Sequence, residues 1–407
     1  MYRLFNNTSG YYLPAFLCIQ LNDKIDTQNF ENHTDEVKGT FIHEYCHFLQ
    51  DVSTTYGYSN FICFIQEFLY KIRREKVESD KKILEYNRDF HNLHYGDNEI
   101  EDDMFLISKV EVVEDEICKE LYPQDTVEKV MVKYNLSKEF QFGNCCIMES
   151  MAYLVEKRLY KVRRRENEFP YNVCEEICKH EYAAFARNEI WIMALCELAL
   201  LELDSGVFFI KALRLMKEKK FIPATVNDIQ VFIDKNFTIG FRGKKDKIEL
   251  LLSEVYPDCG LDFSKIKEWI VKRFEIGCDY REISKCFISL SLCSEDAGVR
   301  FGIWNTLMRD FGCPVLIDSD GNRIEGAYLG QEEIDISFML APMAIDKLLD
   351  RNGLHIIEEC PLIPLCLSAG DSLYSDTCRK DLTKDINNRE LLCVVKWFWK
   401  MYQLDRD

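Results

Sequence analysis

Two histidines four residues apart, with a glutamate directly after the first, are the residues of this chain best suited to chemistry. They are His43, Glu44 and His47, in the sequence His-Glu-Tyr-Cys-His. On a helix, residues four apart lie on one face, so both imidazoles can bind one zinc ion. Glu44 lies about 100° around the helix from His43 and can bring its carboxylate to a metal-bound water. This arrangement supports metal-assisted hydrolysis of a peptide bond.

An apolar helix over residues 36–52 must position these three side chains. Its apolar residues are Val37, Phe41, Ile42, Cys46, Phe48 and Leu49. The pattern is typical of a helix buried beside an active site, and Gly39 is its one weak position. The alternative is a pair of histidines that only pack or hydrogen-bond in the core. We prefer the metal site, because two histidines and a glutamate in one buried turn are hard to satisfy without a metal.

A catalytic zinc site needs a third protein ligand and an open fourth position. A third histidine six residues after His47 is missing, because Ser53 occupies that position. Glu149 is the best candidate, since it lies among apolar residues of a predicted helix over 144–165, where a buried carboxylate needs a cation or a metal. The small Ala152, one turn further on, would let this helix approach the first one closely.

These residues together resemble the zincin metallopeptidases, and specifically the gluzincin type. In that group the two histidines of the motif and a glutamate from a later helix bind zinc, and the later helix often carries Glu-x-x-Ala, as at Glu149 and Ala152. The resemblance implies that His43, His47 and Glu149 bind one Zn²⁺ and that Glu44 is the general base. It covers at most the first half of the chain, and the two helices are further apart in sequence than in many members of the group.

Other residues remain open as the third ligand or as helpers of the site. His91 and His94 lie in a polar stretch that we expect to be an exposed loop. Glu156 lies two turns beyond Glu149 on the same helix face, so it would either bind the metal or orient a ligand histidine. The candidates for stabilising the oxyanion are Tyr153, Tyr171, His180 and Tyr182.

Composition argues against nucleic acid and membranes as partners. The chain has 407 residues and a formal net charge of −18, which disfavours DNA or RNA. No signal peptide is predicted, and the longest apolar stretches, such as residues 190–201, are too short to span a bilayer. The chain carries 18 cysteines without an export signal, which predicts a cytoplasmic protein with mostly free thiols.

The cysteines show no second metal-binding pattern. Cys174 and Cys178 are one helical turn apart without a partner pair, and we expect them to be core thiols. Structural zinc modules usually bring their ligands in close pairs, and the cysteines near the end of the chain are irregularly spaced. Those four are Cys360, Cys366, Cys378 and Cys393.

The predicted fold class is α+β, with a small sheet and active-site helices followed by a mainly helical C-terminal region. We expect residues 1–217 to form a zincin-like metallopeptidase domain with a β-rich insertion at about 78–143. Residues 218–407 would form a mainly helical C-terminal domain that selects substrates or regulates. The boundary falls in the charged, proline-containing segment 217–225.

Hydrophobic periodicity and turn residues predict the individual elements. The strands are expected at 11–21, 104–113, 127–133 and 140–142. The helices are expected at 36–52, 59–77, 144–165, 173–188 and 189–217, with mainly helical structure over 226–312. Residues 314–324 are typical of a hairpin that turns over Asp320 and Gly321.

The function expected from these residues is a cytoplasmic zinc-dependent peptidase that acts on a protein or peptide substrate. The alternative is a regulatory or interaction protein whose zinc site is structural or latent. Glu44 speaks against the alternative, because a purely structural site does not need it. A cytoplasmic protease without a pro-segment must be restrained by narrow specificity, by a signal or by a regulatory protein partner.

Overall fold

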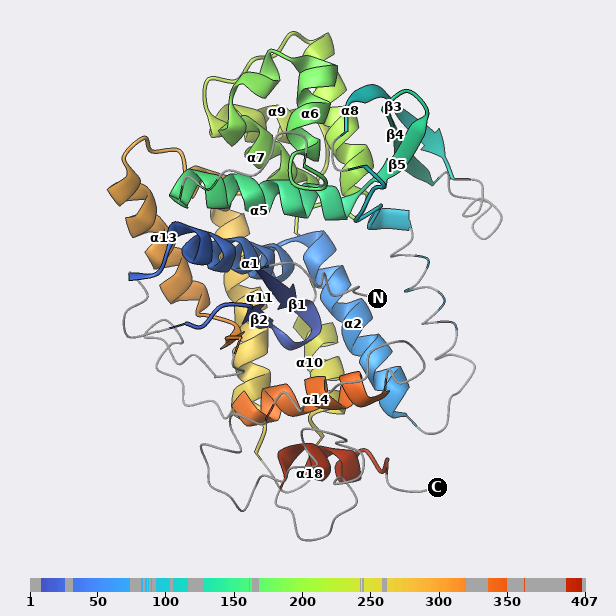
Figure 1. Cartoon of the computed structure of the whole chain (residues 1–407), viewed down its shortest axis with the longest axis vertical. Coiled ribbons are helices and arrows are strands. Elements are labelled where there is room, and N and C mark those ends of the chain that lie inside the picture. The colour runs from blue at the N-terminus through green and yellow to red at the C-terminus, as the bar shows by residue number, and fades with distance from the viewer. Residues whose placement is uncertain are drawn as a thin grey trace.

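The described part of the chain has an α+β fold in which helices predominate and two small sheets lie apart from each other (Figure 1). In this computed structural model, none of the helices among the described residues is long and apolar enough to cross a membrane. The structure describes residues 9–25, 32–73, 82, 85, 87, 89, 93–102, 105–115, 127–160, 162, 168–241, 243, 245–257, 262–319, 336–349, 362 and 393–404.

The first sheet begins with a hairpin where we expected a single strand over 11–21. Strand β1 (Gly10–Leu13) runs antiparallel to β2 (Cys18–Leu21). The single-strand prediction is wrong because Pro14 starts a short 3₁₀ helix and Leu17 takes a left-handed conformation with φ of 43°, so the chain reverses. Proline has a fixed φ and no N–H, which suits the first turn of a helix better than a strand.

The helix that carries the histidine motif is α1 (Asp35–Ser53), in agreement with the prediction. The side chain of Thr34 caps its first turn by accepting a hydrogen bond from the Val37 N–H, at 3.4 Å. Helix α2 (Thr55–Ile72) starts at residue 55 and not at 59, because Thr54 both ends α1 and caps α2. The Thr54 N–H donates to Gln50 O, and its hydroxyl accepts from the Gly57 N–H.

The β-rich insertion is an antiparallel sheet of three strands, β3 (Ile107–Glu114), β4 (Glu128–Tyr134) and β5 (Lys138–Phe142). The strands expected in this region are thereby confirmed. Alternate side chains are buried, as expected for a sheet with one face on the core. These are Val130, Val132, Tyr134, Phe140 and Phe142.

Four helices follow the insertion, and two predictions about their bounds are wrong. They are α5 (Asn144–Tyr160), α6 (Val173–Tyr182), α7 (Glu189–Ala199) and α8 (Ser205–Glu218). The single helix expected over 189–217 breaks after Ala199, where other elements take up the freed carbonyl groups. Leu200 O accepts from the Tyr56 N–H and Leu203 O from the Asn144 amide, each at 3.1 Å. The helix expected over 173–188 likewise stops at Tyr182.

Residues 226–312 are mainly helical, as expected, and further helices follow them. These elements are α9 (Val226–Asn236), α10 (Lys245–Val255), α11 (Ser264–Ile283), α12 (Phe287–Ser291), α13 (Ala297–Phe311), α14 (Ile336–Leu349) and α18 (Val394–Met401). Of the expected hairpin over 314–324, the first arm contains β6 (Val315–Ile317), and the turn over 320–321 lies outside the described residues.

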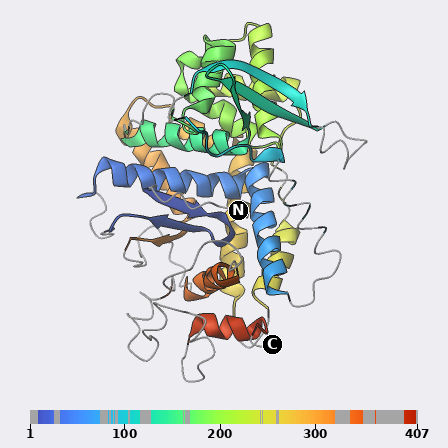
Figure 2. The same cartoon turned by 45° about the vertical axis from the view of Figure 1, so that its right-hand side comes forward.

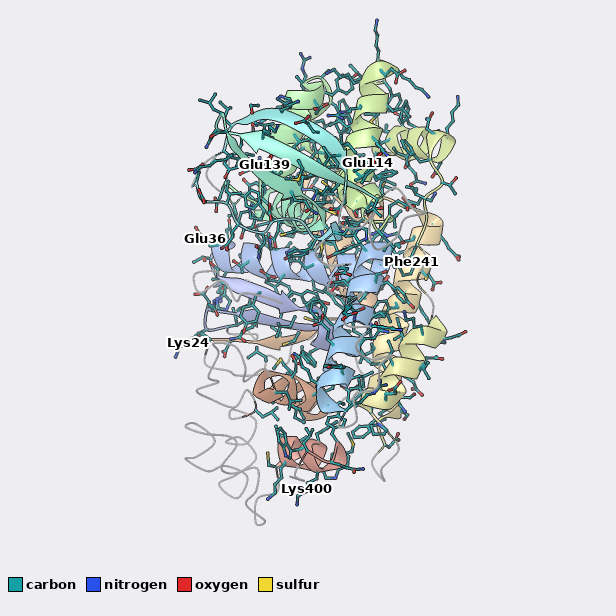
Figure 3. All side chains as sticks on the ribbon, turned by 90° about the vertical axis from the view of Figure 1, so that its right-hand side faces the viewer. Lys24, Glu36, Glu114, Glu139, Phe241 and Lys400 are labelled. Carbon is teal, nitrogen blue, oxygen red and sulfur yellow. The ribbon has the colours of Figure 1, made fainter. Side chains whose placement is uncertain are left out.

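The division at residue 217 stays a prediction, and elements from its two sides meet in the structure. Strand β6 pairs in parallel with β2, and α11 packs against α1. Figure 3 shows side chains between the ribbons from the insertion sheet, where Glu139 is labelled, to α18, where Lys400 is labelled.

A buried arginine on α11 forms an ion pair with α7 and a hydrogen bond with the end of the motif helix. The Arg281 guanidinium donates to Ser53 O at 2.8 Å and to Glu197 Oε1 at 2.5 Å. Glu197 also accepts from the Ile288 and Ser289 N–H groups at the start of α12, at 3.0 and 2.8 Å. Because both charges are hydrogen-bonded, burial does not leave either one uncompensated. The end of α1 is therefore held by α7, α11 and α12.

Gly277 makes the close crossing of α11 over α1 possible, and its replacement provides a test. A Cβ at this position would lie 2.1 Å from Val52 O. We expect Gly277→Ala to destabilise the protein by about 1–3 kcal/mol, as overpacking usually does. Gly302→Ala on α13 is the matched control: its Cβ would meet no atom within 4 Å, and alanine favours the helix. Chemical denaturation that ranks the two variants in the opposite order would contradict this packing.

Candidate metal site

Helices α1 and α5 lie one above the other, with the β1–β2 hairpin on the opposite side of α1 (Figures 1 and 2). Small residues allow the two helices to approach. Ala152 on α5 is fully buried. A Cβ on Gly39 would lie 3.1 Å from Glu156 Oε1 and 2.8 Å from a methyl group of Val162. Gly39, the weak position of the predicted helix, thus leaves room for the side chain of Glu156.

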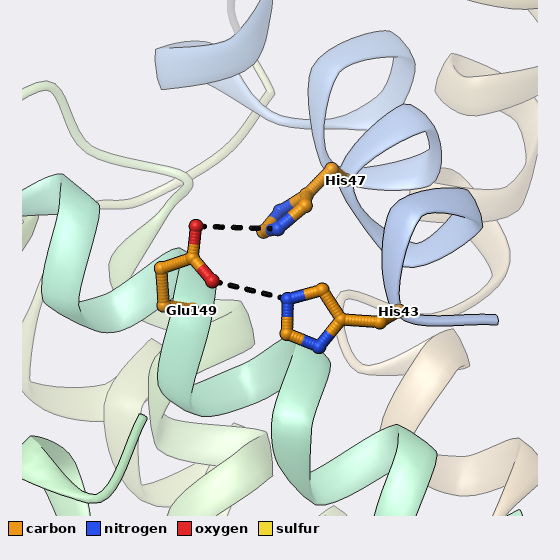
Figure 4. A group of neighbouring side chains, drawn as sticks. All are labelled: His43, His47 and Glu149. Atoms are coloured by element: carbon orange, nitrogen blue, oxygen red, sulfur yellow. Dashed lines mark hydrogen bonds and ion pairs between the residues drawn. The ribbon is translucent and has the colours of Figure 1, made fainter. Parts of the chain in front are cut away.

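Three side chains from these helices converge on one point (Figure 4). His43 Nε2 lies 3.0 Å from Glu149 Oε2, and His47 Nε2 lies 3.5 Å from Glu149 Oε1. Ligand atoms about 2.0–2.2 Å from a tetrahedral zinc lie roughly 3.3–3.5 Å apart, close to both separations. One potential ligand atom from each residue lies within 4.8 Å of the others, so the group can hold a metal ion.

The second nitrogen of each imidazole has its own partner. His43 Nδ1 lies 3.2 Å from Glu156 Oε2, and His47 Nδ1 lies 2.9 Å from Gln50 Oε1. With hydrogen atoms on both Nδ1 atoms, each Nε2 would offer its lone pair to a metal once it loses the hydrogen that points to Glu149. Of the two roles left open for Glu156, the geometry favours orienting His43.

Of the two rival histidines, His94 is described by the structure and is not part of this group. His94 Nδ1 pairs with Asp204 Oδ1 at 2.5 Å. His91 lies outside the described residues. Sequence reasoning missed Gln50, although a buried amide one turn after a ligand histidine is the signal that would have revealed it.

The group is buried but reaches the surface at the glutamate. The side chains of His43 and His47 are 4% and 9% exposed, whereas that of Glu149 is 23% exposed. Burial acts to lower the pKa of His43, but hydrogen bonds to Glu149 and Glu156 outweigh it and raise the pKa well above its usual value. Burial acts to raise the pKa of Glu149, but the charge of His47 and the hydrogen bonds from both histidines hold it below its usual range.

These directions predict that metal binding displaces a proton. With its pKa raised, His43 holds near neutral pH a proton that a metal must remove. Since the free protein binds the proton and the metal-bound form does not, zinc affinity should rise with pH, by about tenfold per unit for each proton released. Chelator competition on both sides of neutral pH, with calorimetry in two buffers of different ionisation enthalpy, measures this. An affinity that does not change with pH would contradict the protonated free site.

Glu44 lies beside the group without belonging to it. It is 7% exposed. It directly follows His43 on α1, and its charge contributes to the raised pKa of both His43 and His47. A carboxylate beside a metal-binding group is the type of side chain that transfers protons in hydrolytic sites.

Among the oxyanion candidates, Tyr171 is the one that the described contacts bring to the histidines. Its ring packs edge-on against His43, with centroids 5.7 Å apart, and Tyr153 packs against Tyr171 at 6.4 Å. The Tyr182 hydroxyl instead donates to Phe221 O, and His180 lies 3.6 Å from Glu181.

The cysteines behave as predicted where the structure describes them. Cys46, Cys174 and Cys178 are buried free thiols, and the other described cysteines are free as well. Of the four cysteines near the end of the chain, only Cys393 lies within the described residues.

Comparison of the chain with protein-family models, with curated proteins and with solved structures found no match. Its functional interpretation therefore rests on the residues and geometry of the site itself.

Proposed function

We propose that the protein is a zinc-dependent peptidase of the zincin type, gluzincin-like in its ligands, with His43, His47 and Glu149 holding one Zn²⁺. The observation that carries the proposal is the convergence of both motif histidines, through Nε2, on one carboxylate of a second helix. Two imidazoles and one carboxylate suit zinc, and three protein ligands are typical of hydrolytic zinc sites.

Each side chain of the site has a separate role in the proposed hydrolysis. A bound zinc ion would polarise the scissile carbonyl and activate a water molecule. Glu44 accepts a proton from the attacking water and delivers it to the leaving amine. Tyr171 is the favoured candidate to stabilise the oxyanion, because it packs against His43. Glu156 keeps the His43 ring in place.

An extended segment of a protein or peptide is the proposed substrate. In many zincins the edge strand beside the active-site helix pairs with substrate. Among the described strands, β1 is an edge strand of its sheet. It lies against α1, where Tyr12 packs on Phe48 with ring centroids 6.4 Å apart. Main-chain pairing along β1 would bring an extended chain past the face of α1 that carries Glu44.

The accessible ligand favours this function over a regulatory protein with a structural zinc site. A structural zinc has four protein ligands and is closed. The Glu149 side chain retains 23% exposure. A cytoplasmic location is also proposed, since the described cysteines are free thiols. Restraint by a regulatory protein partner remains part of the proposal.

A comparison of new protein N-termini tests this function. Lysates that receive the wild-type protein with zinc are compared with lysates that receive Glu44→Gln with zinc. We expect a set of N-termini that appears only with the wild type and disappears when a chelator is added. Identical N-termini in both lysates, with zinc bound to the wild type, would remove the peptidase assignment and favour the regulatory alternative.

A further inference from the structure

We infer that Gln50 is a positioning residue that sets His47 and Glu149 in place together by connecting α1 and α5 at the metal site. The inference rests on the metal site of the proposed function and does not require that the protein hydrolyses peptides.

The Gln50 side chain uses both ends of its amide, each on a different helix. Its Oε1 accepts from His47 Nδ1 at 2.9 Å, within α1. Its Nε2 donates to Met148 O on α5, at 3.1 Å. Met148 directly precedes Glu149, and Gln50 is 1% exposed. One buried amide therefore bonds to one ligand and to the backbone beside another ligand.

The amide is the chemical group that this position requires. A carboxylate accepts hydrogen bonds but donates none when ionised, so it would leave Met148 O without this donor. An apolar side chain could hydrogen-bond to neither His47 Nδ1 nor Met148 O. His43 does not need an amide partner. Its partner Glu156 lies on α5 itself and only has to accept the hydrogen bond from His43 Nδ1.

The two hydrogen bonds have separate consequences. The bond to Nδ1 fixes the His47 ring with Nε2 toward Glu149, and such partners typically contribute 10–100-fold to metal affinity. The bond to Met148 O fixes how far α5 is shifted along α1 at the position of Glu149. If ligands on separate helices are misplaced relative to each other, metal affinity falls, because the protein must deform to bind the metal.

The test measures zinc affinity of the full chain by chelator competition at one pH, together with the stability of the zinc-free form. Gln50→Met, similar in volume but without the amide, should bind Zn²⁺ roughly 10–100-fold more weakly. Gln50→Glu restores the acceptor for His47 and should regain part of that affinity. If Gln50→Met does not fold, Gln50→Asn replaces it in the experiment. Asparagine keeps the amide on a shorter side chain, and the same loss of zinc affinity is expected.

Asn144→Ala is the matched control. The Asn144 amide is also buried and also donates to a backbone carbonyl, Leu203 O, at the same 3.1 Å. It should lower stability without changing zinc affinity. The inference is overturned if Gln50→Met binds zinc as the wild type does, if Gln50→Glu binds no better than Gln50→Met, or if Asn144→Ala weakens zinc equally.

These outcomes are distinct from failure of the proposed function. A wild-type chain that binds no Zn²⁺ would overturn the metal site and the role of Gln50 together. Zinc binding that depends on Gln50, in a protein without hydrolytic activity, would leave the positioning role intact and remove the peptidase alone.

Discussion

Glu44→Gln is expected to lower peptide hydrolysis by roughly two to four orders of magnitude, the usual scale for removing an acid–base group. Glutamine keeps the shape of the side chain but cannot take a proton from water. Zinc content should stay at the wild-type level, because the metal-binding group consists of His43, His47 and Glu149 without Glu44. The measurement is kcat/KM on a substrate found by the N-terminus comparison, with metal analysis of the same preparation.

Glu36→Gln provides the matched control for this experiment. Glu36 lies in the first turn of the same helix and is exposed (Figure 3). The same chemical change there should leave both zinc and activity near the wild-type values. Full activity of Glu44→Gln, or loss of its zinc, would contradict the assignment of Glu44 as a general base that is not a ligand.

Glu149→Ala is expected to reduce bound zinc from about one equivalent to a small fraction, and His43→Ala should do the same. A metal bound by the two histidines and Glu149 would connect α1 and α5, which are far apart in sequence, so binding free energy would add to folding free energy. At zinc concentrations about 1,000 times the Kd, this contribution is about 4 kcal/mol. Thermal denaturation with zinc and with chelator separates it from other effects of the substitution.

The control for the ligand variants is His94→Ala, which removes a histidine paired with Asp204 outside the metal-binding group. Its zinc content should not change. In the wild type, zinc should raise the melting temperature, whereas in Glu149→Ala zinc and chelator should give nearly equal values. A Glu149→Ala protein that keeps one equivalent of zinc would remove Glu149 from the site.

The motif residues were predictable because their relation is local. His43, Glu44 and His47 belong to one helix, and helical geometry alone decides which of them share a face. Glu149 was predictable for a different reason, since an ionisable side chain among apolar neighbours requires a partner. The strands of the insertion were predictable because alternating apolar residues are a local pattern too. The structure confirms the three expected strands.

Errors occurred where a local pattern competed with contacts from elsewhere. The apolar run through residues 190–201 predicted an uninterrupted helix, but Tyr56 and Asn144 hydrogen-bond to the carbonyl groups of a break after Ala199. The parallel pairing of β6 with β2 joins segments separated by most of the chain, and no local pattern indicates it.

The sequence by itself determined which side chains are able to bind a metal, because side-chain chemistry and spacing on one helix do not depend on the rest of the fold. Only the tertiary structure decided how the potential ligands on α1 and α5 are placed relative to each other. Glu149 and Glu156 lie on one face of α5, and the shift of α5 along α1 decides that Glu149 meets both Nε2 atoms while Glu156 meets His43 Nδ1. That shift depends on the packing at Gly39 and on the Gln50 bridge, both of which are contacts between segments far apart in the chain.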